Sequence, residues 1–286
     1  MTTNQSMAGK ICMVTGATSG LGKATAEGLA ALGAKVILVA RDQRKAEEVK
    51  REIAQRTGND SSELLLADLS SSASIRSAAA DFLARHAKLH VLVNQAGVIV
   101  SDRQLTKEGV ELMFAVNHLA YFTLANLLLP ALKAGAPSRI INIGGGVAAA
   151  GDIHFDDING EKKFSWLRQA AQSKLGNVLF TYEMARRLQG TGVTVNCIDP
   201  GGARTGLAQN TKGLPRLMMK LMGPLMPTAE KGAQPAIRMA SAPEFEGVTG
   251  KYFQKLKETK SAPKSYDEAL AKRLWDVSAK LAGIQA

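Results

Sequence analysis

Cysteine is scarce in this chain of 286 residues: it occurs only as Cys12 and Cys197, each inside a strand-like apolar run. Thiols in separate apolar runs are more typical of buried, reduced cysteines than of a disulfide or a metal site. The sequence therefore predicts no metal centre, and its cysteine usage fits a cytoplasmic protein.

Long apolar runs are also missing. No stretch approaches the roughly 20 apolar residues that a membrane-spanning helix needs. Residues 1–10 are polar and lack the apolar core of a signal peptide. We therefore expect a soluble protein without a membrane span, although the hydrophobic content of 45% is enough for a substantial core.

Acidic residues are outnumbered, with 25 Asp and Glu against 36 Lys and Arg, which gives a formal charge of +11. Such a charge can attract nucleic acid, but along residues 41–56 the cations are interleaved with acids, as on a solvated helix face. The one lopsided run, five lysines within residues 251–264, lacks the interleaved aromatics of a single-strand binder. We predict no nucleic-acid partner.

A glycine-rich stretch, residues 14–22, follows the apolar run 11–14 and opens into the helical pattern 23–32. Its glycines are Gly16, Gly20 and Gly22, which permit a tight turn and a close backbone approach. The helix that follows can present free N–H groups and its positive dipole end to a diphosphate. The pattern favours a dinucleotide site, with an ordinary glycine-rich turn as the alternative.

Apolar runs and helical patterns alternate after this turn. Strands are expected at 35–40, 64–67, 91–94, 139–143, 193–198 and 251–253, and helices at 42–56, 74–86, 109–132, 167–188 and 229–240. The alternation predicts a doubly wound α/β fold: a mostly parallel, seven-stranded sheet with helices on both faces and ligands at the carboxyl ends of its strands. No linker is evident, so we expect a single domain over residues 1–286.

The end of the second expected strand bears on the choice of dinucleotide. An acidic side chain there would accept the hydroxyls of the adenosine ribose, but this chain has Ala40 followed by Arg41. An arginine can pair with a 2′-phosphate through charge-assisted hydrogen bonds. We predict that NADP(H) is preferred over NAD(H), unless Arg41 is a surface charge neutralised by Asp42.

Four of the ten methionines lie within residues 214–227, between the last crossover and the last expected helix. Methionine adapts to irregular apolar shapes. Because loops at the carboxyl edge of a sheet often cover a substrate, we expect a lid over an apolar substrate within residues 202–228. An ordinary packed connector is the alternative.

Blocks along nearly the whole chain resemble the short-chain dehydrogenase/reductase family, and most closely its retinol-dehydrogenase-like branch. The matching blocks are the turn from Thr15 to Gly22, Asp68-Leu69, Asn94-Gln95-Ala96-Gly97, the segment 114–119 with Asn117, residues 155–159, Ser173-Lys174-Leu175 with 177–179, Pro200-Gly201 with Thr205, and residues 247–253. The resemblance makes Asn117 an active-site residue and Lys174 the catalytic lysine. It implies a Rossmann-like fold, nicotinamide-dependent oxidoreductase activity on an alcohol or carbonyl compound, and a homodimer or homotetramer.

The residues expected to bind the cofactor come from these blocks and from the end of the second strand. They are Gly16, Thr18, Ser19, Gly20, Leu21, Gly22, Arg41, Asp68, Leu69, Asn94, Ala96, Gly97, Lys174, Pro200, Gly201 and Thr205.

The chain departs from the family at two catalytic positions. In the family's Tyr-x-x-x-Lys motif the tyrosine stands four residues before the lysine, where this chain has Ala170. That spacing puts phenol and ammonium on one helix face, so the lysine lowers the pKa of the tyrosine that exchanges a proton with the substrate oxygen. The serine that polarises this oxygen aligns with Gly145. With Asn117 and Lys174 retained, we expect a degenerate site and severely impaired carbonyl reduction.

Three functions stay open on this evidence. The first is weak redox turnover through a replacement acid, for which Asp199 and His154 are candidates, although a turn cap and a loop residue are their plainer interpretations. The second is a non-redox enzyme that retains the nucleotide and catalyses cyclisation, elimination or isomerisation. The third is a nucleotide-binding pseudoenzyme or an inactivated engineered chain.

Overall fold

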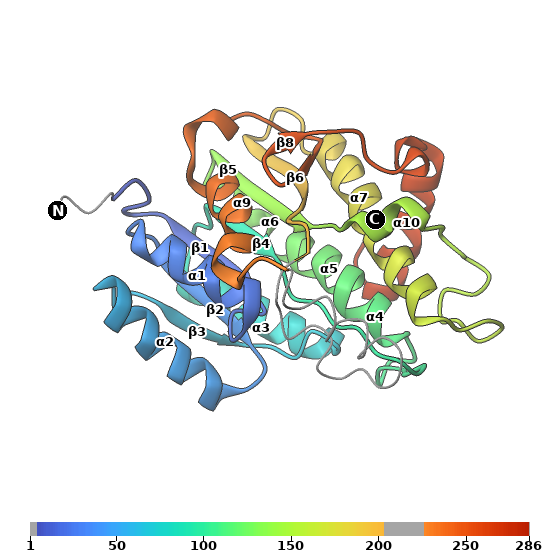
Figure 1. Cartoon of the computed structure of the whole chain (residues 1–286), viewed down its shortest axis with the longest axis horizontal. Coiled ribbons are helices and arrows are strands. Elements are labelled where there is room, and N and C mark those ends of the chain that lie inside the picture. The colour runs from blue at the N-terminus through green and yellow to red at the C-terminus, as the bar shows by residue number, and fades with distance from the viewer. Residues whose placement is uncertain (1–4, 203–225, 286) are drawn as a thin grey trace.

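The protein is described by a computed structural model for residues 5–202 and 226–285 (Figure 1). Within these ranges the chain forms a sheet with the strand order β3-β2-β1-β4-β5-β6-β7-β8. The strands are β1 Ile11–Thr15, β2 Lys35–Ala40, β3 Glu63–Leu66, β4 Val91–Asn94, β5 Ser138–Ile143, β6 Val193–Asp199, β7 Lys251–Gln254 and β8 Lys257–Glu258. β1 to β7 pair in parallel, and β8 runs antiparallel to β7. The predicted doubly wound α/β fold is confirmed.

The described sheet has eight strands rather than the seven predicted. The additional strand, β8, is two exposed residues long and therefore too short to leave a periodic apolar pattern in the sequence. The strand order reverses between β1 and β4, so their carboxyl ends lie side by side at the switch point where open α/β sheets bind ligands.

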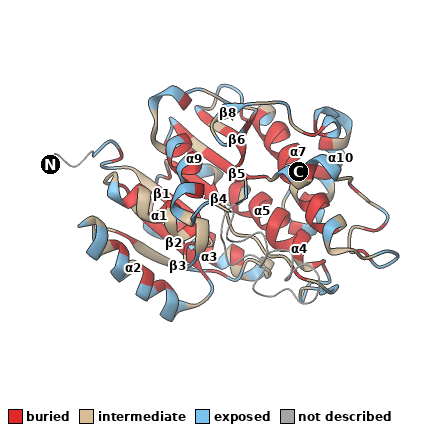
Figure 2. Cartoon of the chain, in the orientation of Figure 1, coloured by how far each residue is buried: buried red, intermediate tan, exposed pale blue. Residues whose placement is uncertain are grey.

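Helices cover both faces of the sheet (Figure 1). One face carries α1 Gly20–Ala31, α2 Gln43–Thr57 and α9 Ala229–Ser241, and the other carries α3 Ser72–Arg85, α5 Ala120–Leu127, α7 Trp166–Arg187 and α10 Glu268–Ala282. Buried residues fill the strands and the inward helix faces, whereas the outer side of α2 is exposed (Figure 2). In α2 the buried Ala46, Val49 and Ile53 recur every three or four residues, which is the spacing of one helix face.

The segment predicted over residues 109–132 is helical from Leu112 to Ala134, but it is divided into pieces. The structure has a short α4, Leu112–Phe114, then a π-helical turn, Ala115–Leu119, followed by α5 and α6 Leu129–Ala134. α5 ends at Leu127 because Pro130 lies in the first turn of α6, where its missing N–H and fixed φ suit a helix start but not a helix interior. The π-helical turn carries Asn117 and His118.

The C-terminal helix α10 was not predicted, although its end signals stand in the sequence. Asp267 accepts a hydrogen bond from the backbone N–H of Leu270 at 2.9 Å, and Gly283 takes a left-handed conformation at the other end. The indole ring of Trp275 anchors α10, because its centroid lies 4.9 Å from that of Phe122 on α5. α10 therefore packs directly over the helices that carry the site.

Some of the expectations from the sequence concern residues that the structure does not describe. The expected lid over residues 202–228 lies almost entirely outside the described residues, as does Thr205. Among the helices that the structure describes, none is long and apolar enough to cross a membrane. In the same ranges, no group of three or more His, Cys, Asp or Glu side chains is placed to hold a metal ion.

Candidate functional site

The glycine turn connects β1 to α1 at the switch point. Gly16 and Gly20 have φ values of 68° and 51°, which side chains disfavour. A Cβ atom at Gly22 would overlap the carbonyl oxygen of Gly16, so only glycine lets the helix pack against the turn. A Cβ atom at Gly16 would also lie 3.0 Å from Cα of Ala96 in the loop after β4. Gly16 and Gly22 therefore allow a close backbone approach, and Gly16 and Gly20 allow a positive φ.

The first backbone N–H groups of α1 are not capped by the side chain of the N-cap residue. The side chain of its N-cap residue Ser19 makes no capping hydrogen bond, and the first turn contains no acidic residue. The first N–H groups of a helix then suit an anion. Beside this turn, both polar side-chain atoms of Gln95 are buried without a partner in the described part of the chain. The turn, the open helix end and the orphaned amide together fit the diphosphate part of a dinucleotide.

The loop after β4 is tied to this turn. The buried Thr15 hydroxyl accepts hydrogen bonds from the backbone N–H groups of Gln95 and Ala96 at 2.8 and 2.9 Å. Deeper in the sheet, the Asn94 amide donates to Oδ1 of Asn142 on β5 at 2.9 Å. The predicted residues Asn94 and Ala96, with Gly97 next in the chain, thus lie at the strand ends that flank the glycine turn.

The residues expected to bind the adenosine half of the dinucleotide follow β2 and β3. Arg41 is exposed, and the Asp42 carboxylate accepts from the backbone N–H of Lys45 at 3.1 Å, where it caps α2. Burial raises the pKa of Asp68, but hydrogen bonds from Ser70 and the positive charge of Arg41 outweigh it and leave that pKa below its ordinary value. Arg41 therefore lies close enough to Asp68 to attract its carboxylate, whereas the Asp42 carboxylate caps α2.

Asn117 joins the π-helical turn to the loop after β4. Its Oδ1 accepts from the backbone N–H of Val98 at 2.7 Å, and its Nδ2 donates to the carbonyl of the same residue at 3.0 Å. Nδ2 also lies 3.4 Å from the hydroxyl of Ser173 on α7. The side chain is buried, and it connects the loop after β4 with the π-helical turn and with α7.

Lys174 extends from α7 to the carboxyl end of β5. Its Nζ donates to the carbonyl oxygen of Ile143 at 3.0 Å and lies 5.8 Å from the ring centroid of Tyr121. Burial lowers the pKa of Lys174 to about 8, although the nearby Cys197 and Asp199 favour its charged form. The ammonium is therefore held at the strand ends with a pKa close to neutrality.

The three consecutive glycines after β5 differ in the space around them. A Cβ at Gly144 would lie 2.8 Å from Sγ of Cys197, so a side chain there is excluded. A Cβ at Gly145 would lie 3.9 Å from Cγ of Lys174, an ordinary contact, and Gly145 is extended (φ 160°, ψ 148°). Position 145 therefore faces Lys174, and within residues 5–202 and 226–285 it has room for a side chain.

Ala170 precedes Lys174 by one turn of α7 and is buried. It belongs to a small apolar cluster with Val100 and Met113, against which Phe164 and Trp166 pack. Position 170 therefore carries no polar group and borders an apolar wall.

Of the two candidate replacement acids, Asp199 lies at the strand ends. It is buried at the end of β6, and its Oδ1 accepts from the backbone N–H of Gly201 at 2.9 Å, so the turn-cap interpretation is confirmed. Its Oδ2 would lie 3.5 Å from a Cβ at Gly146. The backbone of His154 instead donates to Oε1 of Gln172 at 2.9 Å, which places His154 in the loop before α7.

The four tyrosines all lie in the described ranges and occupy other places. Tyr121 donates its hydroxyl to the carbonyl of Ala96 at 2.7 Å, and burial raises its pKa. The rings of Tyr182 and Tyr266 stack with their centroids 5.6 Å apart. Tyr252 is buried on β7, where burial likewise raises its pKa.

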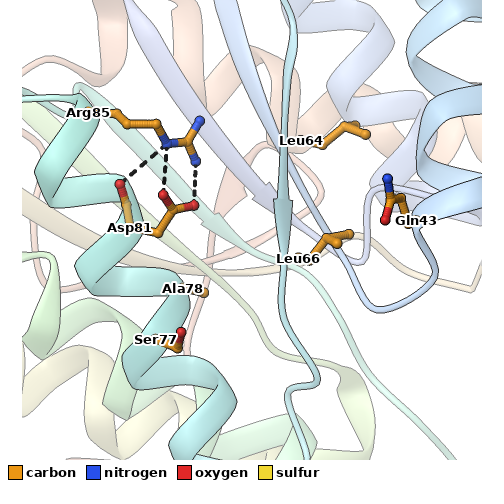
Figure 3. A pocket seen from close by; sticks show the side chains of 7 residues that line it. All are labelled: Gln43, Leu64, Leu66, Ser77, Ala78, Asp81 and Arg85. Carbon is orange, nitrogen blue, oxygen red and sulfur yellow. Dashed lines mark hydrogen bonds and ion pairs between the residues drawn. The ribbon is translucent and has the colours of Figure 1, made fainter.

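A separate hollow of about 520 Å³ opens at the sheet edge beside β3 (Figure 3). Its lining consists of Gln43, Leu64, Leu66, Ser77, Ala78, Asp81 and Arg85. Arg85 is turned toward Asp81 on α3, with 2.8 Å between Nη2 and Oδ2. None of these seven residues is among those expected to bind cofactor or substrate.

Sequence reasoning gave no role to two buried polar residues close to Lys174. His118 follows Asn117 in the π-helical turn, and Asn177 lies on α7 three residues after Lys174. Both side chains are fully buried. Residues three positions apart lie on one face of a helix, so the sequence spacing could have indicated that Asn177 lies near Lys174.

Comparisons with known proteins agree with this geometry. The model of the family described as short chain dehydrogenase matches residues 10–213. Human Retinol dehydrogenase 14 is 42% identical over 295 residues, covering 97% of this chain and 88% of that protein. A crystal structure of an uncharacterized protein from Mycobacterium Paratuberculosis has a TM-score of 0.80 at 29% identity, with 97% of this chain and 95% of that chain covered.

A complex with a bound nucleotide is also similar. The Pseudomonas aeruginosa RhlG/NADP active-site complex has a TM-score of 0.69 at 27% identity, with 89% of this chain and 97% of that chain covered. The family model extends from the start of β1 past the end of β6 and therefore includes the glycine turn, Asn117 and Lys174. The chain belongs to the short-chain dehydrogenase family of oxidoreductases.

Proposed function

We propose that this protein binds NADP(H) in preference to NAD(H) and interconverts an apolar alcohol and its carbonyl compound, slowly, through a non-standard acid. The observation that carries the proposal is the setting of Lys174, whose ammonium lies at the end of β5. Gly145 lies beside Cγ of Lys174 and Ala170 lies one helical turn before it, and neither position has a polar side chain. In the family resemblance these two positions belong to the serine and the tyrosine. The apolar cluster around Ala170 supports an apolar substrate.

The remaining groups have separable roles in this proposal. NADP(H), when bound, supplies or accepts a hydride. The glycine turn and the N-terminus of α1 hold the diphosphate, and Asn117 fixes the loop after β4. Lys174 and Asp199 are two ionisable groups beside the glycine run, and either can exchange a proton through water with the substrate oxygen. Because the chain has no serine hydroxyl at position 145 and no phenol at position 170, these positions can neither polarise the substrate oxygen nor donate a proton to it directly.

Oxidation of NADPH with a panel of apolar aldehydes and ketones tests the proposal. We expect turnover about 10²- to 10⁴-fold below that of a family member with the complete motif, because a general acid contributes about that factor. Lys174→Met should abolish the remainder, whereas Lys162→Met, an exposed lysine, should leave it unchanged. Nucleotide binding without any turnover would overturn the redox proposal in favour of a non-redox or purely binding role. Turnover at ordinary rates would overturn the assignment of a deficient site.

The cofactor preference gives a second test. Arg41→Ala should weaken NADPH binding by about 10- to 100-fold, because a charge-assisted hydrogen bond contributes about 1.5 to 3 kcal/mol. NADH binding should change little, since NADH has no 2′-phosphate to lose a partner. Calorimetric titration of both nucleotides measures the two effects.

The matched control is Arg44→Ala, which removes an exposed arginine from the first turn of α2. This variant lowers the net charge equally but leaves Arg41 in place, so both affinities should stay close to wild type. Equal affinities of the wild-type protein for NADPH and NADH would show that Arg41 does not select the phosphate.

A further inference from the structure

A chain of buried polar groups connects the C-terminal helix with the site. Oγ of Ser278 on α10 lies 3.0 Å from Nε2 of His118 in the π-helical turn. Nδ1 of His118 lies 3.3 Å from Oδ1 of Asn177 on α7. All three side chains are fully buried, so each depends on its neighbour in place of water.

The chain ends at the carbonyl that holds the lysine. Nδ2 of Asn177 donates to the carbonyl oxygen of Asn117 at 2.8 Å and to that of Ile143 at 3.1 Å. The Ile143 oxygen is also the acceptor for Nζ of Lys174 at 3.0 Å. One amide thus fixes the π-helical turn, the end of β5 and, through β5, the ammonium.

The hydrogen-bond directions follow from the chemistry of the groups. Because Nδ2 of Asn177 donates to two carbonyls, its Oδ1 faces His118 and can only accept. Nδ1 of His118 therefore carries the proton, and Nε2 accepts from the hydroxyl of Ser278. Burial lowers the pKa of His118 to about 4, which keeps the ring neutral in this arrangement.

The position of Ser278 depends in turn on how α10 packs. Trp275, one turn before it, lies 4.1 Å beneath the guanidinium of Arg187 on α7 and contacts Phe122 on α5. α10 lies beyond residues 10–213, the part of the chain that the family model matches. The polar chain therefore joins an element outside that match to a residue at the centre of the site.

We propose that Ser278, His118 and Asn177 are positioning residues, through which the docking of α10 holds the Lys174 ammonium in place. Asn177 acts by fixing the Ile143 carbonyl, His118 by orienting the Asn177 amide, and Ser278 by holding the His118 ring at Nε2. The consequence for catalysis rests on the proposed function, but the placement of the ammonium can be measured without a substrate.

Competitive acetylation of the full-length protein with acetic anhydride, followed by mass spectrometry across a pH series, gives the pKa and the reactivity of Lys174. Around the ammonium are the ring of Tyr121 on α5 and the side chains of Cys197 and Asp199 on β6, which stay unchanged in every variant. Wild type should titrate near the pKa of about 8 that burial produces.

The variants should loosen the ammonium to different extents. Asn177→Leu removes the second donor to Ile143, so Lys174 gains freedom and hydration and its pKa should rise by about one unit or more. His118→Phe should produce a smaller rise and Ser278→Ala the smallest, because each acts one step farther away. Faster acetylation at a fixed fraction of neutral amine should accompany each rise.

Ser138→Ala is the matched control for Ser278→Ala. It removes a buried serine hydroxyl that donates to the carbonyl of Leu132 at 2.8 Å, at the end of β5 opposite to Ile143. We expect a comparable loss of thermal stability with no change in Lys174 labelling. If Asn177→Leu does not fold, the proposal is tested by the difference in Lys174 pKa between Ser278→Ala and Ser138→Ala: a rise in the first variant alone supports it, and no rise in either overturns it.

Two results bear on the proposal in opposite ways. Folded Asn177→Leu and His118→Phe variants with wild-type Lys174 titration would overturn it and leave these residues a structural role alone. A graded rise in the Lys174 pKa would support it, even in a protein that proves unable to oxidise NADPH. That combination would reject the proposed function and retain the positioning role.

Discussion

Ala170→Tyr and Gly145→Ser, made together, should raise NADPH-dependent carbonyl reduction by about 10²- to 10⁴-fold over wild type. Position 170 lies one helical turn before Lys174, so the ammonium would stand beside the new phenol and lower its pKa. The serine hydroxyl would polarise the substrate oxygen while the phenol donates its proton. Each single substitution should give far less, because groups that act as a unit are strongly non-additive.

The backbone at Gly145 favours this substitution. A run of three glycines can adopt positive φ values, at which a serine would be strained, but Gly145 is extended (φ 160°, ψ 148°). Among the described residues, the nearest atom to a new Cβ is Cγ of Lys174 at 3.9 Å, an ordinary contact that places the serine beside the lysine. The adjacent Gly144→Ser offers a contrast, because its Cβ would lie 2.8 Å from Sγ of Cys197.

The tyrosine has a cost in stability that must be separated from its chemistry. Its ring enters the buried cluster of Val100 and Met113, and overpacking of this kind costs about 1 to 3 kcal/mol. Ala170→Phe with Gly145→Ser carries the same ring without the hydroxyl and is the matched control. Initial rates of NADPH oxidation with the carbonyl panel, beside melting curves, give both quantities. Equal rates for the tyrosine and phenylalanine pairs would contradict the assignment of position 170.

The sequence predicted those parts of the fold that depend on local patterns. Glycine spacing located the turn at Gly16, Gly20 and Gly22, and apolar runs located β2 and β4 to the residue. Local signals also existed for two features that were not predicted. Pro130 indicates the break at Leu128, and Asp267 and Gly283 indicate the two ends of α10.

Other features depend on residues that meet only after folding. The sequence does not show which of Gly144 and Gly145 has space for a side chain. Cys197 from β6 lies against the first, and among the described residues only Cγ of Lys174, at 3.9 Å, comes near the second. His118 and Ser278 are 160 positions apart along the chain, and no periodic pattern brings them together. The cytoplasmic location and the homodimer or homotetramer stay predictions, because neither follows from contacts within one chain.

Gly22→Ala should abolish measurable NADP(H) binding, the other large effect that we expect. The new methyl group would overlap the carbonyl oxygen of Gly16. That oxygen belongs to the backbone, and a Cβ has no rotamer that could avoid it. The start of α1 must then move off the turn, which displaces the N–H groups that face the diphosphate. An affinity loss of more than about 100-fold corresponds to about 2.7 kcal/mol, the scale of one or two lost charge-assisted hydrogen bonds.

Gly28→Ala in the same helix is the matched control. Its methyl group would overlap Cδ1 of Ile237 on α9, but that atom is the end of a flexible side chain that can change rotamer. Alanine also gains about 1 kcal/mol of helix propensity over glycine, which offsets part of the repacking cost. We therefore expect Gly28→Ala to bind NADPH like wild type in calorimetric titration. If Gly22→Ala, shown to be folded by circular dichroism, also binds NADPH at wild-type affinity, the diphosphate does not lie at this turn.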